Sequence, residues 1–364
     1  MNNLANVRYQ FGKAVQRNEV HEALELALAR KNEFRALVTA ISYHRYEIAE
    51  WLIRLGWDVN EVQEHDGMTP LHAAIRKRYV GLVSQLIFRG ANIYQTDNTG
   101  NTPLATCVKV KMNAQALRIY QILASRMTDT DFHGKNILGD TLLHAVGRNA
   151  WAPLDVYRDL IRRGVDVNER DAYTGRNFVM EMLIFQTDEY FAIRVVSLAI
   201  HHGLDINATD AFGNTILHRM ASEGREIELR WFSGLPNVRV RVANTQGQTP
   251  IWIAARRGNT KVFQMLHGMG ETVEGEAYLY SGGQVRKTVR EVALGNENYE
   301  IAELVDQELG ARGIEESRRS VKSLFALTRK AIRDELVKDG MNMAPKIERL
   351  GLPKVLEKSL GFIE

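Results

Sequence analysis

The chain is 364 residues long, carries a formal net charge of +3, and is 45% hydrophobic and 25% charged. This composition is ordinary for a soluble protein, and so small a net charge gives no general basis for binding nucleic acid or a membrane surface. The single cysteine excludes an intramolecular disulfide. The first residues lack an apolar core of signal-peptide length, and no apolar run approaches the roughly 18 residues of a membrane span. We expect an intracellular protein of the cytoplasm, with the nucleus as the other open compartment.

The first part of the chain has a helical pattern without any turn signal. Residues 8–34 place apolar side chains at three-and-four spacing, beginning with Phe11, Ala14 and Val15. No turn glycine and no Thr-Pro pair precedes them. Because a stack of repeats must cover the apolar face of its first member, we expect residues 1–35 to form an N-terminal helical cap.

The segment 66–75, Asp-Gly-Met-Thr-Pro-Leu-His-Ala-Ala-Ile, predicts a turn followed by a helix. Gly67 suits the turn because glycine reaches positive φ without steric cost. Thr69 can accept a hydrogen bond from the free N–H groups of the first helical turn, and Pro70 fits the first helical position. The segment is therefore a capped helix start that leads into an apolar face.

The same pattern recurs along the chain. Clear copies follow Gly100 and Gly247, and looser copies follow Gly139 and Gly213. The turn glycines are separated by 33, 39, 36, 38 and 34 residues: Gly67, Gly100, Gly139, Gly175, Gly213 and Gly247. A Thr-Pro-Leu-His-x-Ala unit with this period resembles the ankyrin repeat. The resemblance implies an all-α-dominated ankyrin-repeat solenoid, built from helix-turn-helix units and hairpin turns.

About eight repeats are expected over residues 36–308. The first begins near Leu37, and residues 132–137 are an insertion before the fourth. The fifth is degenerate, because Asn177 and the residues after it replace the usual Thr-Pro-Leu-His start. The last uses residues 287–308, and its match to the pattern is weaker.

The recurrent histidines and the cysteine have structural explanations. His72, His144 and His218 recur because the repeat recurs, and the resemblance implies that each bonds to the backbone of a neighbouring loop. Cys107 stands 33 residues after Ala74, which predicts a small buried side chain rather than a reactive thiol. The chain has no Cys-x-x-Cys, His-Glu-x-x-His, Gly-x-Gly-x-x-Gly or Walker-type motif. We therefore expect a protein that is not an enzyme and that has no cofactor and no metal.

Four aromatic residues are candidates for contact with a target protein. Tyr94, Tyr173 and Phe212 lie near turn tips, and aromatic residues are enriched at binding hot spots. Trp252 replaces the usual histidine, and we expect it to be partly exposed. The alternative is that each of the four packs against an adjacent turn.

After residue 308 the ankyrin period ends. Residues 309–319 are polar and interrupted by glycine, which indicates a junction. Residues 323–332 then predict an amphipathic helix, with apolar side chains three and four positions apart on one face. Further apolar residues follow a polar link at Asp339 and Gly340.

This tail, residues 320–364, resembles a SOCS box, the small three-helix module that recruits Elongin B and Elongin C. Ser323-Leu324 and Ile332 match its first motif in register, with Thr328 where cysteine is usual. Its second motif, Leu-Pro-Leu-Pro, appears as Leu350-Gly351-Leu352-Pro353. An ankyrin array with such a tail resembles the ankyrin repeat and SOCS box-containing protein family.

The resemblance implies a substrate-recognition adaptor of an Elongin B/C-cullin-RING E3 ubiquitin ligase. Ser323, Leu324, Leu327, Thr328 and Ile332 would bind Elongin C, with Leu324 inserted in a pocket. Residues 350–353 would select the cullin, expected to be the fifth cullin with its RING subunit. The ankyrin array would hold a protein substrate whose identity the sequence does not reveal.

Two alternatives remain open. Residues 320–364 can instead be a plain cap on the last repeat, or another type of degradation box, because any solenoid needs a cap. The chain would then be an ankyrin scaffold or inhibitor that binds a partner protein and has no link to ubiquitin. An enzyme on a decorated solenoid would require a cluster of acid, base and nucleophile in a cleft.

Overall fold

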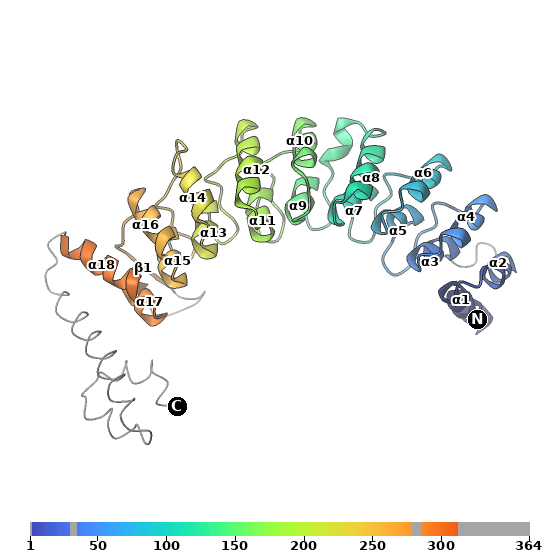
Figure 1. Cartoon of the computed structure of the whole chain (residues 1–364), viewed down its shortest axis with the longest axis horizontal. Helices are drawn as coiled ribbons and strands as arrows, with labels where there is room; N and C mark the ends of the chain where they lie inside the picture. The colour runs from blue at the N-terminus through green and yellow to red at the C-terminus, as the bar shows by residue number, and fades with distance from the viewer. Residues whose placement is uncertain (1, 30–34, 279–285, 312–364) are drawn as a thin grey trace, which may run out of the picture. The chain divides into compact units, whose positions relative to one another are not determined.

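The computed structural model describes residues 2–29, 35–278 and 286–311, and these residues are mostly helical. The chain divides into two compact units, Met1–Ile216 and Leu217–Glu364. Within the described residues, each unit contains short helix pairs that are joined by turns (Figure 1).

The first unit carries two helices before the repeats and a pair in each repeat. Its elements are α1 (Asn2–Arg17), α2 (Val20–Ala29), α3 (Ala36–Ser42), α4 (Tyr46–Arg54), α5 (Pro70–Arg76), α6 (Val80–Phe88), α7 (Pro103–Lys109), α8 (Ala114–Ala124), the 3₁₀ helix η1 (Asp129–His133), α9 (Leu142–Gly147), α10 (Leu154–Arg162), α11 (Phe178–Phe185) and α12 (Glu189–His201). Helix α13 (Ile216–Glu223) begins at the end of this unit.

The helices of the first unit form two rows. The first helices α3, α5, α7, α9 and α11 pack in succession, and α4, α6 and α8 form a second row (Figure 1). Each pair buries a band of apolar side chains, such as Leu71, Ala74 and Ile75 of α5. Burying such side chains contributes about 1.5–3 kcal/mol each for the larger ones, so the stacking itself stabilises the array.

The threonine caps form as the sequence predicts. The Thr69 side chain accepts a hydrogen bond from the backbone of His72, and Pro70 occupies the first turn of α5. Thr141 caps α9 in the same way. In the degenerate fifth repeat, Asn177 performs this function, because its side chain accepts from the backbone of Met180. Asparagine and threonine both supply the oxygen that the first helical turn lacks.

The turns between repeats are joined by backbone hydrogen bonds. Asn98 N donates to Asp66 O at 2.9 Å, Ile137 N to Thr99 O at 3.2 Å, Ala172 N to Leu138 O at 3.0 Å and Ala211 N to Thr174 O at 2.8 Å. Each turn therefore holds the next in a ladder. The approach is close: a Cβ on Gly139, where φ is +76°, would lie 2.9 Å from Ala172 N. Glycine is required at that position.

The first repeat obtains its cap from a different residue. Arg35 precedes α3 and makes no side-chain cap. Instead, the buried Glu61 accepts hydrogen bonds from Val38 N at 2.8 Å and from Trp57 Nε1 at 2.9 Å. Burial raises the pKa of Glu61 to about 7, although both hydrogen bonds oppose this shift.

The second unit continues the same architecture. It contains α14 (Glu226–Phe232), α15 (Pro250–Arg257), α16 (Thr260–Gly268), α17 (Val289–Gly295) and α18 (Tyr299–Ala311). Strands β1 (Glu276–Tyr278) and β2 (Arg286–Thr288) pair antiparallel, with Ala277 opposite Lys287. The side chains of Thr288 and Glu291 form a capping box at the start of α17.

Two predictions made from the sequence are confirmed in the core. Cys107 is fully buried, and burial raises the pKa of its thiol to about 12, so it is not a reactive thiolate. The recurrent histidines bond to loop backbone: His72 Nε2 lies 3.1 Å from Asn101 O, and His144 Nε2 lies 3.0 Å from Arg176 O. None of the helices in the described residues is long and apolar enough to cross a lipid bilayer.

Candidate protein-binding surface

Exposed apolar side chains gather on three successive turns of the first unit. We name residues 137–138, 172–173 and 211–212 the turn edge. Ile137 is 67% exposed, Tyr173 73% and Phe212 52%. These large side chains leave the core although apolar residues of this size are usually buried, and grouped exposed apolar residues mark interaction sites.

The backbone of the turn edge is held in place by polar side chains beneath it. Asp171 Oδ1 accepts from Tyr173 N at 2.9 Å, and Asp210 Oδ1 accepts from Phe212 N at 2.9 Å. Asn136 Oδ1 accepts from Leu138 N at 2.9 Å. Hydrogen bonds from neighbouring groups outweigh desolvation and hold the pKa of Asp171 below its ordinary value. The aromatic side chains therefore project from a preorganised support, which lowers the cost of ordering on binding.

Below the turns, a chain of ion pairs links three repeats. Arg148 contacts Asp140 at 2.6 Å and Glu181 at 3.0 Å, and Arg176 contacts Glu181 at 3.5 Å and Asp210 at 3.7 Å. Asp140, Glu181 and Asp210 are buried. Despite desolvation, the Arg148 guanidinium holds the pKa of Asp140 below its ordinary value. Paired in this way, the buried charges join adjacent first helices.

The structure separates the four predicted contact residues. Tyr173 and Phe212 lie together on the turn edge, on neighbouring turns. Tyr94 is 49% exposed, but its hydroxyl donates to Asp131 Oδ2 at 3.4 Å, away from the turn edge. Trp252 is only 2% exposed, so the expectation of partial exposure is wrong.

The burial of Trp252 has a clear physical reason. Its indole Nε1 donates to Lys287 O at 3.0 Å, while His218 Nε2 lies 3.0 Å from Gln248 O. Both acceptors are the residue before the threonine that starts the next repeat's first helix. Trp252 therefore replaces the repeat histidine in its structural role, because the indole N–H is also a donor. A tryptophan at the histidine position of the repeat is compatible with this buried role and with an exposed contact role, so the sequence alone does not show which one applies.

Sequence reasoning missed Ile137 and Leu138, which are 67% and 38% exposed. They stood in or beside a stretch interpreted as an insertion. Leu138 directly precedes the turn glycine Gly139, just as Phe212 directly precedes Gly213, and Ile137 is one residue earlier. Aligning the turn glycines would therefore have identified both residues as turn-tip positions. Within that stretch only part is exposed, since Phe132 is fully buried.

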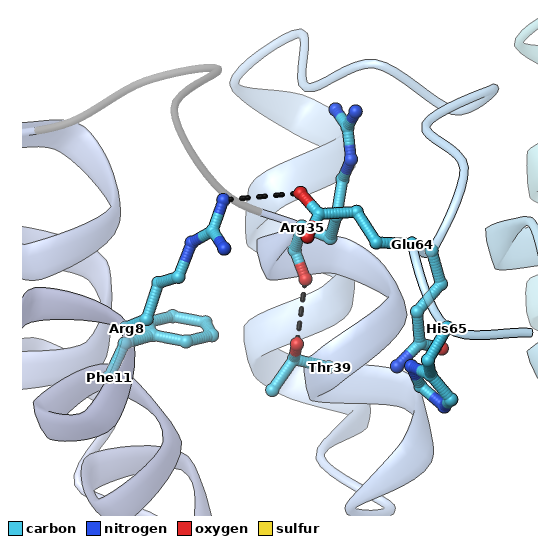
Figure 2. A pocket seen from close by; sticks show the side chains of 7 residues that line it. Arg8, Phe11, Arg35, Thr39, Glu64 and His65 are labelled. Atoms are coloured by element: carbon cyan, nitrogen blue, oxygen red, sulfur yellow. Dashed lines mark hydrogen bonds and ion pairs between the residues drawn. The ribbon is translucent and has the colours of Figure 1, made fainter. Parts of the chain in front are cut away.

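An open pocket lies beside α1 and the start of α3 (Figure 2). It is lined by Arg8, Phe11, Arg35, Thr39, Gln63, Glu64 and His65. Arg8 Nη2 faces Glu64 Oε1 across it at 3.4 Å, and both side chains are exposed. Such a surface pair contributes about 0–1 kcal/mol. Because its charged lining residues Arg8, Arg35, Glu64 and His65 are all exposed, we interpret the pocket as a depression between packed helices rather than as a ligand site.

The sites predicted for the tail cannot be placed. Ser323, Leu324, Leu327, Thr328, Ile332 and residues 350–353 all lie outside the described residues. Among the residues that are described, no group of three or more His, Cys, Asp or Glu side chains could hold a metal ion.

Comparisons with known proteins agree with the geometry. The family model for ankyrin repeats (3 copies) matches residues 11–97 and 37–136. The B-cell lymphoma 3 protein homolog of Mus musculus is 25% identical over 225 residues, which is 60% of this chain and 46% of that protein. The NF-kappa-B inhibitor zeta of Mus musculus is 27% identical over 201 residues, 54% of this chain and 25% of that protein.

A third relative is an ion channel subunit. The transient receptor potential cation channel subfamily V member 6 of Rattus norvegicus is 27% identical over 216 residues, 54% of this chain and 28% of that protein. This chain therefore spans less than half the length of each of these relatives. The chain carries ankyrin repeats, and its described residues form ankyrin-type helical stacks. Ankyrin repeats imply protein–protein binding.

Proposed function

We propose that this chain binds a partner protein through the turn edge and recruits an Elongin B/C-cullin-RING E3 ubiquitin ligase through residues 320–364. The observation that carries the first part is the grouping of Ile137, Tyr173 and Phe212 on three hydrogen-bonded turns. Exposed aromatic side chains on a rigid support are typical of binding hot spots. The chain itself would not be catalytic, because the RING subunit and the conjugating enzyme supply the chemistry.

The second part of the proposal is supported by the sequence of the tail alone. Leu324 would be the main anchor for Elongin C, and Leu350 to Pro353 would select the fifth cullin. By holding a substrate near the ligase, the chain would raise the effective concentration of substrate lysines. We place this activity in the cytoplasm, with access to the nucleus.

Affinity purification from cells tests ligase recruitment. Tagged wild-type protein should recover Elongin B, Elongin C and a cullin, and Leu324→Asp should lose all three. Equal circular dichroism spectra of the two proteins would show that the ankyrin array is intact. Recovery of no Elongin with the wild type would overturn the ligase part of the proposal.

The same purification tests the turn edge. Tyr173→Ser combined with Phe212→Ser should lose co-purifying proteins other than the ligase subunits, while Elongin recovery stays unchanged. The matched control is Phe88→Ser with Tyr190→Ser, which removes two exposed aromatic rings, 88% and 69% exposed, from second helices of the same unit. Equal losses in both double variants would contradict a specific role for the turn edge.

The alternative is a scaffold or inhibitor that binds its partner without any ligase. The similarity to a protein named as an NF-kappa-B inhibitor favours this candidate. It shares the turn edge with the first proposal and differs in the tail. A partner captured by the wild type and by Leu324→Asp alike, with no Elongin in either sample, would support it.

A further inference from the structure

A second surface of the first unit has the opposite chemistry to the turn edge. We give the name loop edge to the loops between the two helices of the first four repeats, residues 43–45, 77–79, 110–113 and 148–153, together with Tyr46, the first residue of α4. These loops contain no Asp or Glu and five Lys and Arg residues: Arg45, Lys77, Arg78, Lys111 and Arg148, of which Arg148 is already paired with the buried Asp140 and Glu181. Aromatic side chains are interleaved with them, among which Tyr43 is 42%, Tyr46 41% and Trp151 62% exposed.

Two loops meet in a polar aromatic cluster. His44 Nδ1 lies 2.7 Å from Tyr79 Oη, Lys77 Nζ lies 2.8 Å from His44 Nε2, and the rings of Tyr46 and Tyr79 lie 3.5 Å apart between centroids. An ammonium group can only donate, so His44 Nε2 must accept and Nδ1 must carry the proton. Tyr79 then accepts from His44, which leaves its own hydroxyl proton for an external acceptor.

Desolvation and the Lys77 ammonium lower the pKa of His44, so its imidazole is neutral at pH 7. A neutral His44 can accept from Lys77 and donate to Tyr79 at once. The cluster therefore presents a positive charge and a hydroxyl donor side by side, which is the complement of a carboxylate.

The next two loops also place a lysine beside an aromatic ring. Lys111 Nζ lies 3.9 Å from the ring centroid of Trp151, a cation–π contact at an exposed site. Asn149 Nδ2 ties these loops together by donating to Val108 O and Val110 O, both at 2.7 Å. The lysine is thus positioned over an exposed ring rather than free in solvent.

Acidic residues mark the limits of the positively charged loop edge along the chain. The nearest carboxylates along the chain are Glu47 and Asp155, in the first turns of α4 and α10, and Asp155 is paired with Arg158 at 2.5 Å. In the fifth repeat the corresponding loop, residues 186–188, contains Asp188. The basic and aromatic stretch is therefore limited to four consecutive repeats.

We propose that the loop edge binds an acidic segment of a partner protein, with carboxylates at Lys77 and Lys111 and apolar side chains against Tyr46 and Trp151. Charge complementarity supports this occupant, because a carboxylate finds cations here without a competing acid in the loops. An extended nucleic acid fits less well. It needs many phosphate contacts, and the whole chain carries a net charge of only +3.

Fluorescence anisotropy on the purified full chain tests the proposal. The probe is a fluorescein-labelled peptide of repeating Glu-Glu-Phe, and the control probe carries Gln in place of each Glu. The acidic peptide should bind the wild type, and Lys77→Glu with Lys111→Glu should weaken binding by about tenfold or more. The charge-matched control, Arg118→Glu with Arg194→Glu, reverses two exposed cations on α8 and α12 and should bind as the wild type does.

Trp151→Ala should weaken binding of the same acidic peptide while leaving the charge unchanged. Equal binding to both double variants, no measurable binding to the wild type, equal binding of the Gln peptide, or tighter binding of a labelled oligouridylate would each overturn the proposal. Because this inference rests on the proposed protein-binding function, the loop-edge variants should also be tested for Elongin recovery. Lost peptide binding with unchanged Elongin recovery would show that the loop edge acts independently of residues 320–364. If no Elongin is recovered even with the wild type, the anisotropy experiment still tests the loop edge.

Discussion

The turn edge and the loop edge both lie on the first unit, yet their polar chemistry is opposite. At the turn edge, Asp171 and Asp210 accept hydrogen bonds from exposed backbone N–H groups of the turns. At the loop edge, side chains donate to carbonyls at the ends of first helices: Arg45 Nε to Val15 O at 2.8 Å and Asn149 Nδ2 to Val108 O at 2.7 Å.

The difference follows from which backbone groups each edge leaves unpaired. A turn tip exposes N–H groups and needs acceptors, whereas the end of a helix exposes carbonyls and needs donors. Carboxylates such as Asp171 and Asp210 therefore serve the turn tips, whereas donors such as Arg45 and Asn149 serve the helix ends. The two edges therefore differ in the chemistry that they present to solvent.

Exchanging a donor for an acceptor at the loop edge should have the largest effect. Asn149→Asp places a carboxylate against two carbonyl oxygens at a buried site, and we expect a loss of about 3 kcal/mol in the free energy of unfolding. Urea denaturation followed by circular dichroism measures this. Asn113→Asp is the matched control: Asn113 Oδ1 accepts from Ala116 N at the start of α8, where aspartate serves equally well. Equal losses in both would break the comparison between the edges.

Crowding the turn edge should have a smaller effect. Gly139→Ala requires a positive φ and brings a Cβ to 2.9 Å from Ala172 N, so we expect a loss of about 2 kcal/mol. Gly134→Ala, where a Cβ would meet nothing within 4 Å, should stay within about 0.5 kcal/mol of the wild type. The same denaturation experiment compares the two. A harmless Gly139→Ala would show that the turn ladder is less rigid than its hydrogen bonds suggest.

The two types of carboxylate should respond oppositely to pH. Hydrogen bonds outweigh desolvation and lower the pKa of Asp97, so the stability it contributes is lost as pH falls below about 4. Glu61 instead has a pKa raised from 4.5 to about 7, so stability declines as pH rises between these values. The combined contribution of Asp97 and Glu61 to the free energy of unfolding should thus be highest near pH 4.5. The Glu61 contribution should change by about 3 kcal/mol between pH 4.5 and 7.

Two variants test which carboxylate causes each pH-dependent change in stability. Asp97→Asn should flatten the acidic limb with little loss at neutral pH, because asparagine occurs naturally at the equivalent Asn136 and Asn244. Glu61→Gln should flatten the limb between pH 4.5 and 7. A profile that neither variant alters would contradict the assignment of both groups.

The sequence predicted the helical pairs well because their signals are local. A threonine, a proline and an apolar stripe define a helix start within ten residues, and Thr69 and Thr141 behave accordingly. The exposure of the four candidate aromatic side chains was only partly predictable. Tyr173 and Phe212 stood at recognisable turn tips, but the burial of Trp252 depends on Lys287, a partner from the next repeat.

The loop edge was not predicted from the sequence either. Its residues are scattered over more than 100 positions and become one surface only when the repeats stack in register. Lys77 and His44 are separated by 33 residues, which is one repeat. A period of this length brings equivalent loops together, so short-range reasoning overlooks surfaces that a column-by-column alignment of the repeats would reveal.

The replacement of histidine by Trp252 has a consequence for acid resistance. His72 Nδ1 accepts from Thr69 N at 3.3 Å while Nε2 serves Asn101 O, so a second ring proton would set two donors against each other. The indole of Trp252 does not take up a proton at these pH values, so it keeps its one hydrogen bond, to Lys287 O. Burial lowers the pKa of His72, so as pH falls the junction that His72 closes should weaken before the junction that Trp252 closes.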